Sequence, residues 1–228
     1  MKSGRLFDFH THTSLGDGEL SPVELIRRAC AGGYQAIAVT EHAAEGELEW
    51  ILPIVVADCE LATRRWDILA LPGIELTHVP VEDVDRLARK AKSLGAKVVV
   101  VHGETPVEPV IPGTNRAALN SSFVDILAHP GLITPEEARM ARDSGTFLEV
   151  SARRGHSLTN GHVVRLATEA RARLLLNSDA HQPDDLLSWE MGMKIALGSG
   201  LTRTDALALL ENNPRALLEK VGIKGQSE

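Results

Sequence analysis

The sequence predicts an α/β fold in which helices cover a parallel sheet. Short apolar runs alternate about seven times with amphipathic stretches, which is typical of repeated strand–helix units. Most apolar runs end at Gly, Pro or polar residues, as buried parallel strands do. The pattern allows either a closed barrel or an open, doubly wound sheet. The expected strands are residues 6–9, 36–40, 68–71, 97–101, 124–128, 146–150 and 174–177.

The expected helices lie between these strands, and the first has a clear start signal. Ser21 suits the N-cap, Pro22 the first helical position and Glu24 a capping box. The segment 134–144 opens with a Thr-Pro-x-Glu sequence of the same kind. The other expected helices are residues 80–94, 160–172, 183–197, 202–210 and 214–221.

Composition limits the class of protein. The chain has 228 residues without a linker or low-complexity tract, and its net charge of −7 does not favour a nucleic-acid partner. Cys30 and Cys59 have no CxxC partner and are expected to be free thiols in a reducing cytoplasm. The N-terminal residues lack an apolar run of signal-peptide length, and no stretch approaches the roughly 20 apolar residues of a membrane span. We therefore expect a cytoplasmic protein without a membrane partner.

Potential metal ligands follow six of the seven expected strands. The carboxyl ends of parallel strands meet at one face of an α/β barrel, where active sites are built. His10 and His12 lie two residues apart in an extended segment, so both side chains point the same way and can hold one metal. Asp179 and His181 have the same spacing. The candidates at strand ends are His10, His12, His42, Glu75, His102, His129, Asp179 and His181.

These residues lie in motifs that resemble the PHP (polymerase and histidinol phosphatase) superfamily. The motifs are DFHTHTSLGDGELSP, TEH, PGIE, VHG, AHP and SDAH, and they occur in family order over residues 7–181. HxH alone is common among hydrolases, whereas the ordered set is specific. Segments such as ELTHVP and VHGETPVEPV are similar to the small histidinol-phosphatase-like branch. The resemblance implies a distorted (β/α)7 TIM-like barrel, and we expect residues 1–228 to form a single domain of this type.

The resemblance also implies a site for two or three divalent metals. Imidazole together with carboxylate suits Zn, Mn or Fe. The family commonly has TDH where this chain has Thr40-Glu41-His42, so Glu41 is expected to accept a hydrogen bond behind a ligand histidine. The implied ligand sets are His10, His12, Glu75 and Asp179 for the first metal, Glu75, His102 and His129 for the second, and Asp17, His42 and His181 for the third.

A positively charged metal cluster would suit a phosphate substrate. Divalent metals lower the pKa of bound water toward neutrality, so we expect a metal-activated hydroxide to attack the phosphorus of a small phosphate monoester. Histidinol phosphate is suggested by the family name alone. Candidates for the general acid are His156, His181 and a metal-bound water. The residues expected to carry catalysis are His10, His12, Glu75, Asp179 and His181.

Other side chains near the strand ends are candidate substrate contacts. Arg153, Arg154 and His156 follow the sixth strand, and an arginine there could hold phosphate with two hydrogen bonds. The alternatives for the arginines are a solvated loop or an ion pair with Glu149, which could instead be an acceptor behind the metal ligands. The remaining expectations are loop contacts to substrate from Glu104 and Asn115, a pocket or turn position for His78, and a structural or surface role for His162.

Three other functions remain open. A phosphodiesterase or nuclease is the first, because related domains accompany DNA polymerases, although the net charge of −7 and the few aromatic residues disfavour it. Metal-dependent amide or lactone hydrolysis is the second. A non-catalytic metal-binding regulatory protein is the third, since retained ligands could serve folding. The expected partner is a small phosphorylated substrate.

Overall fold

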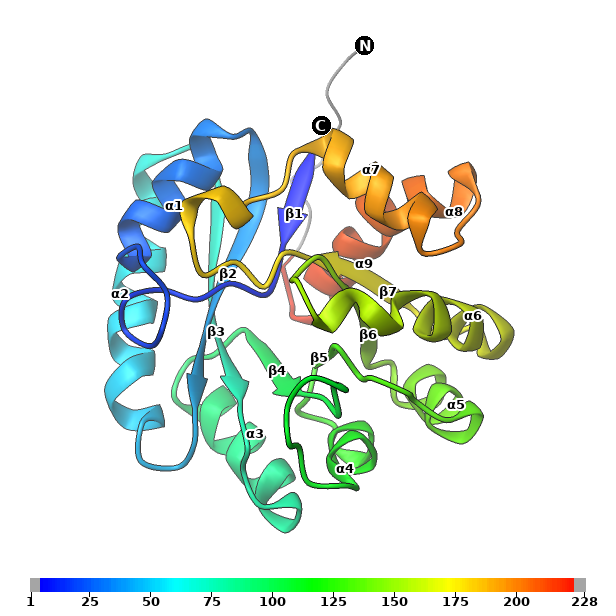
Figure 1. Ribbon diagram of the computed structural model, residues 1–228. Helices are drawn as coiled ribbons and strands as arrows, with labels where there is room; N and C mark the ends of the chain where they lie inside the picture. Colours follow the sequence, from blue (N-terminus) through cyan, green and yellow to red (C-terminus); the bar gives the residue numbers. More distant parts are fainter. Residues whose placement is uncertain (1–4, 224–228) are drawn as a thin grey trace.

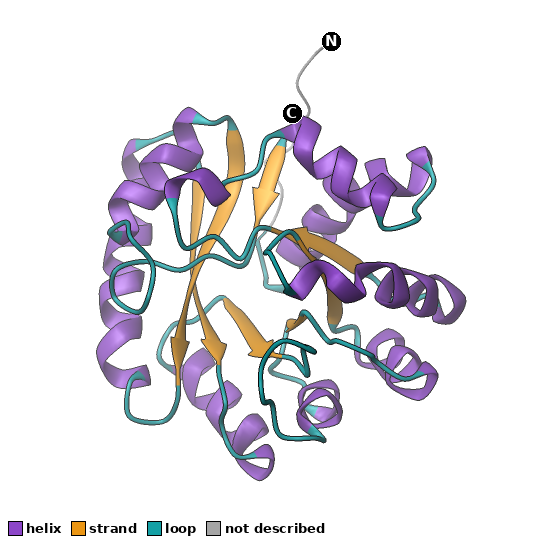
Figure 2. Ribbon diagram, viewed as in Figure 1, coloured by secondary structure: helices purple, strands orange, loops and turns teal. Residues whose placement is uncertain are grey.

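A computed structural model describes residues 5–223 and shows seven parallel strands that are neighbours in chain order. Helices surround the strands (Figures 1 and 2), because each strand must return over the outside of the sheet to pair in parallel with the next. The strands are β1 (Leu6–Asp8), β2 (Tyr34–Ala43), β3 (Leu69–Leu76), β4 (Val98–His102), β5 (Ile126–Ala128), β6 (Phe147–Ser151) and β7 (Leu174–Asn177).

The first and last strands meet just beyond their carboxyl ends. Thr11 and Ala180 form a parallel bridge. The N–H of His12 donates to the carbonyl of Ala180 at 2.8 Å, and the N–H of Asp179 donates to the carbonyl of His10 at 2.9 Å. The sheet is therefore a nearly closed barrel, which decides between the two architectures that the sequence allowed and confirms the PHP-like fold.

The helices follow the predicted order, with additions. The start of α5 is confirmed, since Thr134 and Glu137 form a complete capping box. At α1, Ser21 caps the helix as expected, but the Glu24 carboxylate binds Arg27 and Arg28 in place of closing the box. The α-helices are α1 (Pro22–Ala31), α2 (Leu48–Arg65), α3 (Val84–Ser93), α4 (Thr114–Asn120), α5 (Pro135–Ser144), α6 (Asn160–Ala170), α7 (Trp189–Gly198), α8 (Arg203–Leu207) and α9 (Asn213–Lys220).

The prediction of one helix over residues 183–197 is wrong. A short 3-10 turn, η3 (Pro183–Asp185), comes first. The chain is then extended at Leu186, and Ser188 caps a separate helix, α7. Two further 3-10 turns are η1 (Val81–Asp83) and η2 (His156–Thr159), and a π-helical turn, η4 (Ala208–Asn212), joins α8 to α9.

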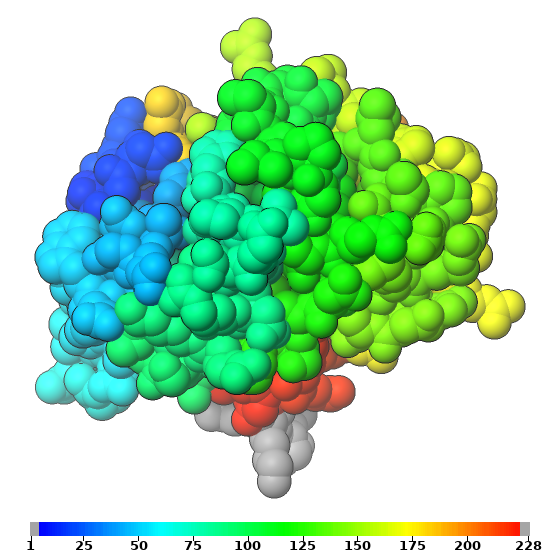
Figure 3. Space-filling model, turned by 90° about the horizontal axis from the view of Figure 1, so that it is seen from below, coloured from blue at the N-terminus to red at the C-terminus, as the bar shows by residue number. Residues whose placement is uncertain are grey.

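Apolar side chains form two layers, one between the sheet and the helices and one inside the barrel. The inner layer is closed by α9, whose Leu217 is fully buried. Asn213 anchors this helix by donating to the carbonyl of Leu174 at 2.8 Å. Figure 3 shows the red C-terminal segment at the bottom of the molecule, whereas green segments from the middle of the chain form the top. The inner layer consists of Phe9, Ala36, Ala38, Leu71, Val98, Val100, Ile126, Ala128, Phe147, Leu175 and Leu217.

The described helices also bear on the membrane expectation. None of those within residues 5–223 combines the length and the apolar character of a membrane span.

Candidate metal centre

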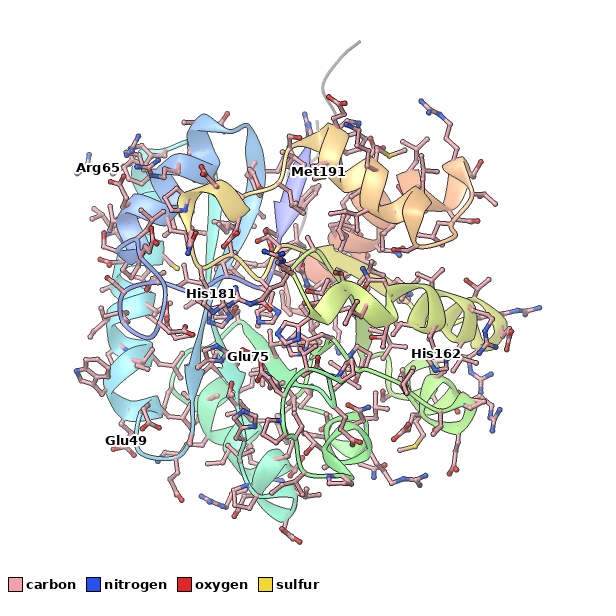
Figure 4. The ribbon with its side chains drawn as sticks, viewed as in Figure 1. Glu49, Arg65, Glu75, His162, His181 and Met191 are labelled. Atoms are coloured by element: carbon pink, nitrogen blue, oxygen red, sulfur yellow. The ribbon has the colours of Figure 1, made fainter. Side chains whose placement is uncertain are left out.

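One cavity opens where the carboxyl ends of the strands meet, and the predicted ligands gather around it. Figure 4 shows Glu75 and His181 near the centre of the barrel, with His162 on the periphery. Parallel strands deliver their ends to the same face, which is why residues distant in sequence converge. The cavity is lined by Asp17, His42, Thr77, His78, His102, Glu108, His129, Arg153, His156, Asp179 and His181.

The segment after β1 aims His10 and His12 inward because the intervening Thr11 faces β2. The Thr11 hydroxyl donates to the carbonyl of Ala38 at 2.6 Å, and its N–H donates to the Thr40 hydroxyl at 3.0 Å. In an extended chain, the residues on either side then point the opposite way. The two side chains thus share one face, as the spacing predicted, and both are fully buried.

The first predicted ligand set is assembled as a compact group. The Nε2 atom of His10 lies 3.3 Å from Oε2 of Glu75, and Nε2 of His12 lies 3.3 Å from Oδ1 of Asp179. Donor atoms bound to one tetrahedral zinc at about 2.0–2.2 Å lie roughly 3.3 Å apart. The spacings therefore suit a single ion held between these four side chains.

The third predicted set also comes together. Oδ1 of Asp17 lies 3.2 Å from Nε2 of His181 and 3.7 Å from Nε2 of His42. His12 joins the same group, with the donor atoms of all four residues within 4.8 Å of one another. The sequence had assigned His12 to the first metal alone.

The second predicted set differs more from its expectation. The group that the structure brings together is His102, His129 and His156, all buried. Glu75 approaches it through Oε1, which lies 3.6 Å from Nε2 of His129. His156 was expected to contact substrate or donate a proton, and no motif indicated that η2 would turn its ring toward His129.

The lack of a side chain at two glycines allows the ends of β4 and β5 to lie close together. A Cβ atom on Gly103 would lie 2.2 Å from the carbonyl oxygen of Ala128, and one on Gly131 would lie 1.9 Å from that of Glu104. Only glycine fits such close approaches. They allow the loops that follow His102 and His129 to pack against each other.

Several candidate ligands are held from behind. Nδ1 of His10 donates to Oε2 of Glu149 at 2.8 Å, and Nδ1 of His181 donates to the carbonyl of Asp179 at 2.9 Å. Nδ1 of His42 differs, because it lies 2.7 Å from both the Thr77 hydroxyl and Oε2 of Glu75. Metal-binding histidines usually have such a partner, because it fixes the ring and leaves the other nitrogen for the metal. The interpretation of Glu149 as an acceptor behind the ligands agrees with this geometry.

The expected partner of Glu41 was a ligand histidine, and that expectation is wrong. The buried Glu41 carboxylate accepts from the N–H of Thr13 at 3.2 Å and from the Thr13 hydroxyl. Burial raises the pKa of Glu41 to about 7. Glu41 therefore holds the loop that carries Asp17, because Thr13 begins that loop.

Glu104 and Asn115 were expected to contact substrate, and the structure gives them another role. Oε1 of Glu104 accepts from the N–H groups of Gly113 and Asn115, both at 2.9 Å. The Asn115 side chain accepts from the N–H of Glu104 at 3.0 Å and donates to the carbonyl of Pro130 at 2.9 Å. These contacts close the base of the loop between β4 and α4.

The two arginines after β6 lie in different environments. Arg153 lines the cavity, donates to the carbonyl of Asp179 at 3.1 Å and lies 3.8 Å from its carboxylate. Its acidic neighbour is thus Asp179 and not Glu149. Arg154 is exposed and does not line the cavity. His162 lies on α6, where Nε2 donates to the carbonyl of Ile133 at 2.7 Å.

Buried polar atoms without a partner test whether these residues fit metals. A buried, unpaired polar atom costs free energy and calls for an explanation such as a bound ion. Within residues 5–223, such atoms are concentrated in this site, and a divalent metal would satisfy most of them. They are Nε2 of His10, Nδ1 and Nε2 of His12, both carboxylate oxygens of Glu75, Nδ1 of His102 and His129, Oγ of Ser178 and Oδ1 of Asp179.

Burial and neighbouring histidines shift the pKa values of the acidic residues in this site. Burial raises the pKa of Asp179 to about 7. Burial also acts to raise that of Glu75, but the positive charges of His10 and His42 outweigh it and hold the Glu75 pKa well below its ordinary value. Asp179 and His129 also adopt positive φ angles of 53° and 24°, which are unusual for residues other than glycine. Strained backbone of this kind is concentrated at functional sites.

Comparison with known proteins places the chain in a family. No family model matches it. Uncharacterized protein MJ1295 of Methanocaldococcus jannaschii is 44% identical, over 94% of this chain and 99% of that protein. A probable phosphatase of Thermoanaerobacter sp. is 27% identical, over 86% and 87% of the two chains. A two-domain protein of Bacteroides vulgatus containing a predicted PHP-like metal-dependent phosphoesterase shares the fold with a TM-score of 0.50 and 17% identity, over 97% of this chain and 66% of that chain. The chain belongs to the PHP superfamily.

Other proteins that are similar to this chain differ in their activities. The histidinol phosphate phosphatase of Lactococcus lactis, solved with zinc, L-histidinol and phosphate, shares the fold with a TM-score of 0.58 and 15% identity, over 96% of this chain and 95% of that chain. The DNA polymerase/3'-5' exonuclease PolX of Bacillus subtilis is 26% identical, but the match covers only 36% of its length. Ribonuclease P protein component 3 of Methanosarcina mazei is 26% identical over 96% of this chain and 91% of that protein. PHP membership thus leaves the substrate open.

Proposed function

We propose that this PHP protein is a metal-dependent phosphoesterase that hydrolyses a small phosphate monoester, as the histidinol-phosphatase-like proteins do. The observation that carries the proposal is the convergence of the nine predicted ligands on one site whose buried donor atoms lack partners. Bound cations would balance the inward-facing carboxylates and satisfy the imidazole nitrogens in this buried space. The whole of residues 1–228 would form one PHP domain.

The residues would divide among three metal positions. His10, His12, Glu75 and Asp179 would hold the first ion, His129 and His102 with Glu75 the second, and Asp17, His42 and His181 the third. Such ions supply an activated water and offset the negative charge of the phosphoryl oxygens. The mixture of imidazole and carboxylate suits Zn, Mn or Fe.

The protein's own groups would bind and orient the phosphate. Arg153 lies beside Asp179 and His181 and faces the cavity, where its guanidinium can donate to phosphate oxygens. Its contact with the Asp179 carbonyl fixes the guanidinium near the ligands. Nε2 of His181 lies 3.2 Å from Oδ1 of Asp17 and would hold the third ion, so His181 would not itself deliver a proton to the leaving oxygen.

Hydrolysis of diesters or nucleic acid is the alternative with specific support. The similarity to ribonuclease P protein component 3 and to PolX favours it. Against it, the net charge of −7 would repel a polyanion. A non-catalytic regulatory protein has less support, because all nine predicted ligands are present and all are brought to the site.

One preparation tests these functions together. The protein would be purified without added metal, its metals counted by elemental analysis, and the same sample assayed on an aryl phosphate monoester, an aryl phosphate diester and single-stranded RNA. We expect two or three metals per chain and monoester hydrolysis that chelation abolishes and Zn, Mn or Fe restores. Preference for the diester or RNA would establish the alternative. No turnover by the reconstituted protein on any of them would contradict the enzymatic proposal.

A further inference from the structure

We propose that Glu108 and His156 complete the donor set of the second metal position, and that Glu108 is an exchangeable ligand which substrate phosphate displaces. The assignment of the ligands stands on geometry, whereas the displacement by phosphate rests on the proposed phosphoesterase function. Neither residue belongs to the ligand sets that the motifs imply. We call His102, His129, His156 and Glu108 the outer cluster.

The distances from Glu108 to two histidines of the outer cluster are those of a metal donor set. Oε2 of Glu108 lies 3.1 Å from Nε2 of His102, and its Oε1 lies 3.4 Å from Nε2 of His156. His102, His129 and His156 each offer a donor atom within 4.8 Å of the others. Atoms that share one tetrahedral zinc are separated by roughly 3.3 Å. Glu108 thus lies at this separation from His102 and His156, and its Oε2 also lies 3.6 Å from Nε2 of the exposed His78.

Contacts behind the rings leave the required atoms free. Nδ1 of His156 contacts the Thr105 hydroxyl at 2.7 Å, so its Nε2 faces the cavity. His156 is 5% exposed and His129 is 3% exposed, so neither ring is a solvated surface group. Three imidazoles, from the ends of β4 and β5 and from the turn after β6, together with one carboxylate suit Zn, Mn or Fe.

Glu108 differs from the other three members because it is accessible. Its side chain is 38% exposed, and it is carried by the loop whose base Glu104 and Asn115 close. Its neighbours Val107 and Ile111 are exposed as well. The base of the loop is therefore fixed while its tip carries the outermost donor, which makes Glu108 the member that can leave without disturbing the barrel.

A phosphate entering the cavity would compete with Glu108. Both are oxygen anions, and both would approach the second position from the open side of the cavity. Their charges repel, and one coordination position cannot hold both. Arg153 also lines the cavity and can pair with the arriving phosphate.

Metal titration of the purified, metal-free full chain tests the ligand assignment without turnover. Co²⁺ would be added against a competing chelator, and the number and affinity of bound ions followed with the visible spectrum. Glu108→Ala and His156→Asn are each expected to lower the affinity for one ion at least tenfold and to leave the affinities for the others unchanged. This effect is at least as large as that of losing a residue that hydrogen-bonds a metal ligand. His162→Asn and Glu190→Gln are matched controls, since both residues lie outside the site.

Phosphate binding to the cobalt-loaded protein tests the displacement. Glu108→Ala should bind inorganic phosphate more tightly than the wild type, and phosphate should change the wild-type cobalt spectrum more than that of the variant. Unchanged metal affinities in a folded Glu108→Ala variant would overturn the ligand assignment. Weaker metal binding with no gain in phosphate affinity would overturn the displacement. If the variants lose metal affinity as expected but the wild-type protein hydrolyses no phosphoester, the phosphoesterase function is rejected and the ligand assignment stands.

Discussion

Asp179 contributes to the candidate centre through its side chain and its backbone. Its carboxylate faces His12 at 3.3 Å, its N–H donates to His10, and its carbonyl accepts from His181. A substitution that keeps the shape of this residue should therefore remove the ligand charge and spare the barrel.

We predict that Asp179→Asn and His10→Ala each lower metal content and abolish most turnover. Asparagine keeps the backbone contacts of residue 179, while losing one anionic donor weakens metal binding by more than the roughly 10–100-fold typical of losing a residue that hydrogen-bonds a metal ligand. Elemental analysis and turnover on an aryl phosphate measure both effects. His162→Ala should retain both, since His162 lies outside the site. Normal metal content and normal activity in a folded Asp179→Asn protein would refute its assignment as a ligand.

A second prediction at this scale concerns Glu41 and pH in the metal-free protein. Burial raises its pKa to about 7, so between about 4.5 and 7 the folded state holds a proton that the unfolded chain has lost. Stability should therefore fall as pH rises through this window and stay low above it. Glu41→Gln should be more stable at pH 8 by up to roughly 3 kcal/mol. Asp8, whose pKa burial also raises to about 7, should leave part of the slope.

Urea unfolding at several pH values measures the effect of Glu41→Gln. Thr13 can still donate its N–H to the glutamine oxygen, so the loop should keep its position. A pH slope identical in variant and wild type would show that Glu41 does not titrate in this window.

The loop between β4 and α4 illustrates an element held at its base. Asn115 bonds Glu104 and Pro130 and is 2% exposed. Asn115→Ala would leave a buried N–H and a buried carbonyl unpaired, at about 1–3 kcal/mol for each unsatisfied group. We predict lower resistance to urea and faster hydrogen exchange over residues 103–113. Asn120→Ala, at the exposed end of α4, should change neither, and equal exchange in both variants would contradict the role of Asn115.

Elements with strong local signals were predictable from the sequence, and those set by tertiary contacts were not. The strand cores and the capped helix α5 follow from apolar periodicity and Thr134. Helix α2 was not predicted, because Pro53 lies within it and its apolar residues spread around more than one face. Helix α4 starts after Gly113 without a capping side chain, so nothing local marks it.

The candidate site divides in the same way. Short-range spacing places His10 beside His12, and strand ends bring in His42, His102 and His129. The contributions of Glu108 and His156 depend on how one loop and one turn fold back over the mouth, and no residue pattern within those segments specifies that. Glu108 stands in the segment VHGETPVEPV, whose position after a strand was the one available signal.

At the scale of the whole molecule, stability and chemistry occupy opposite ends of the barrel. Leu217 is fully buried in the inner layer that α9 closes, away from the metal centre. Leu217→Ala should lower the free energy of unfolding by about 2–5 kcal/mol, since it leaves a cavity in a packed core. Urea unfolding and metal analysis of one sample measure this. Metal content should be unchanged, and the exposed Glu219→Ala on the same helix should have little effect on either.

The meeting of residues 10–12 with residues 179–181 has a consequence for how the chain acquires its structure during synthesis. The earliest histidines leave the ribosome with β1, but their neighbours Asp179 and Ala180 follow more than 160 residues later, and the inner layer waits for Leu217. Contacts so distant in sequence form slowly, because a long loop must close first. A nascent chain therefore holds His10 and His12 exposed through most of its translation. Chelating free metal during synthesis should reveal whether early capture of an ion assists or misdirects the closing of the barrel.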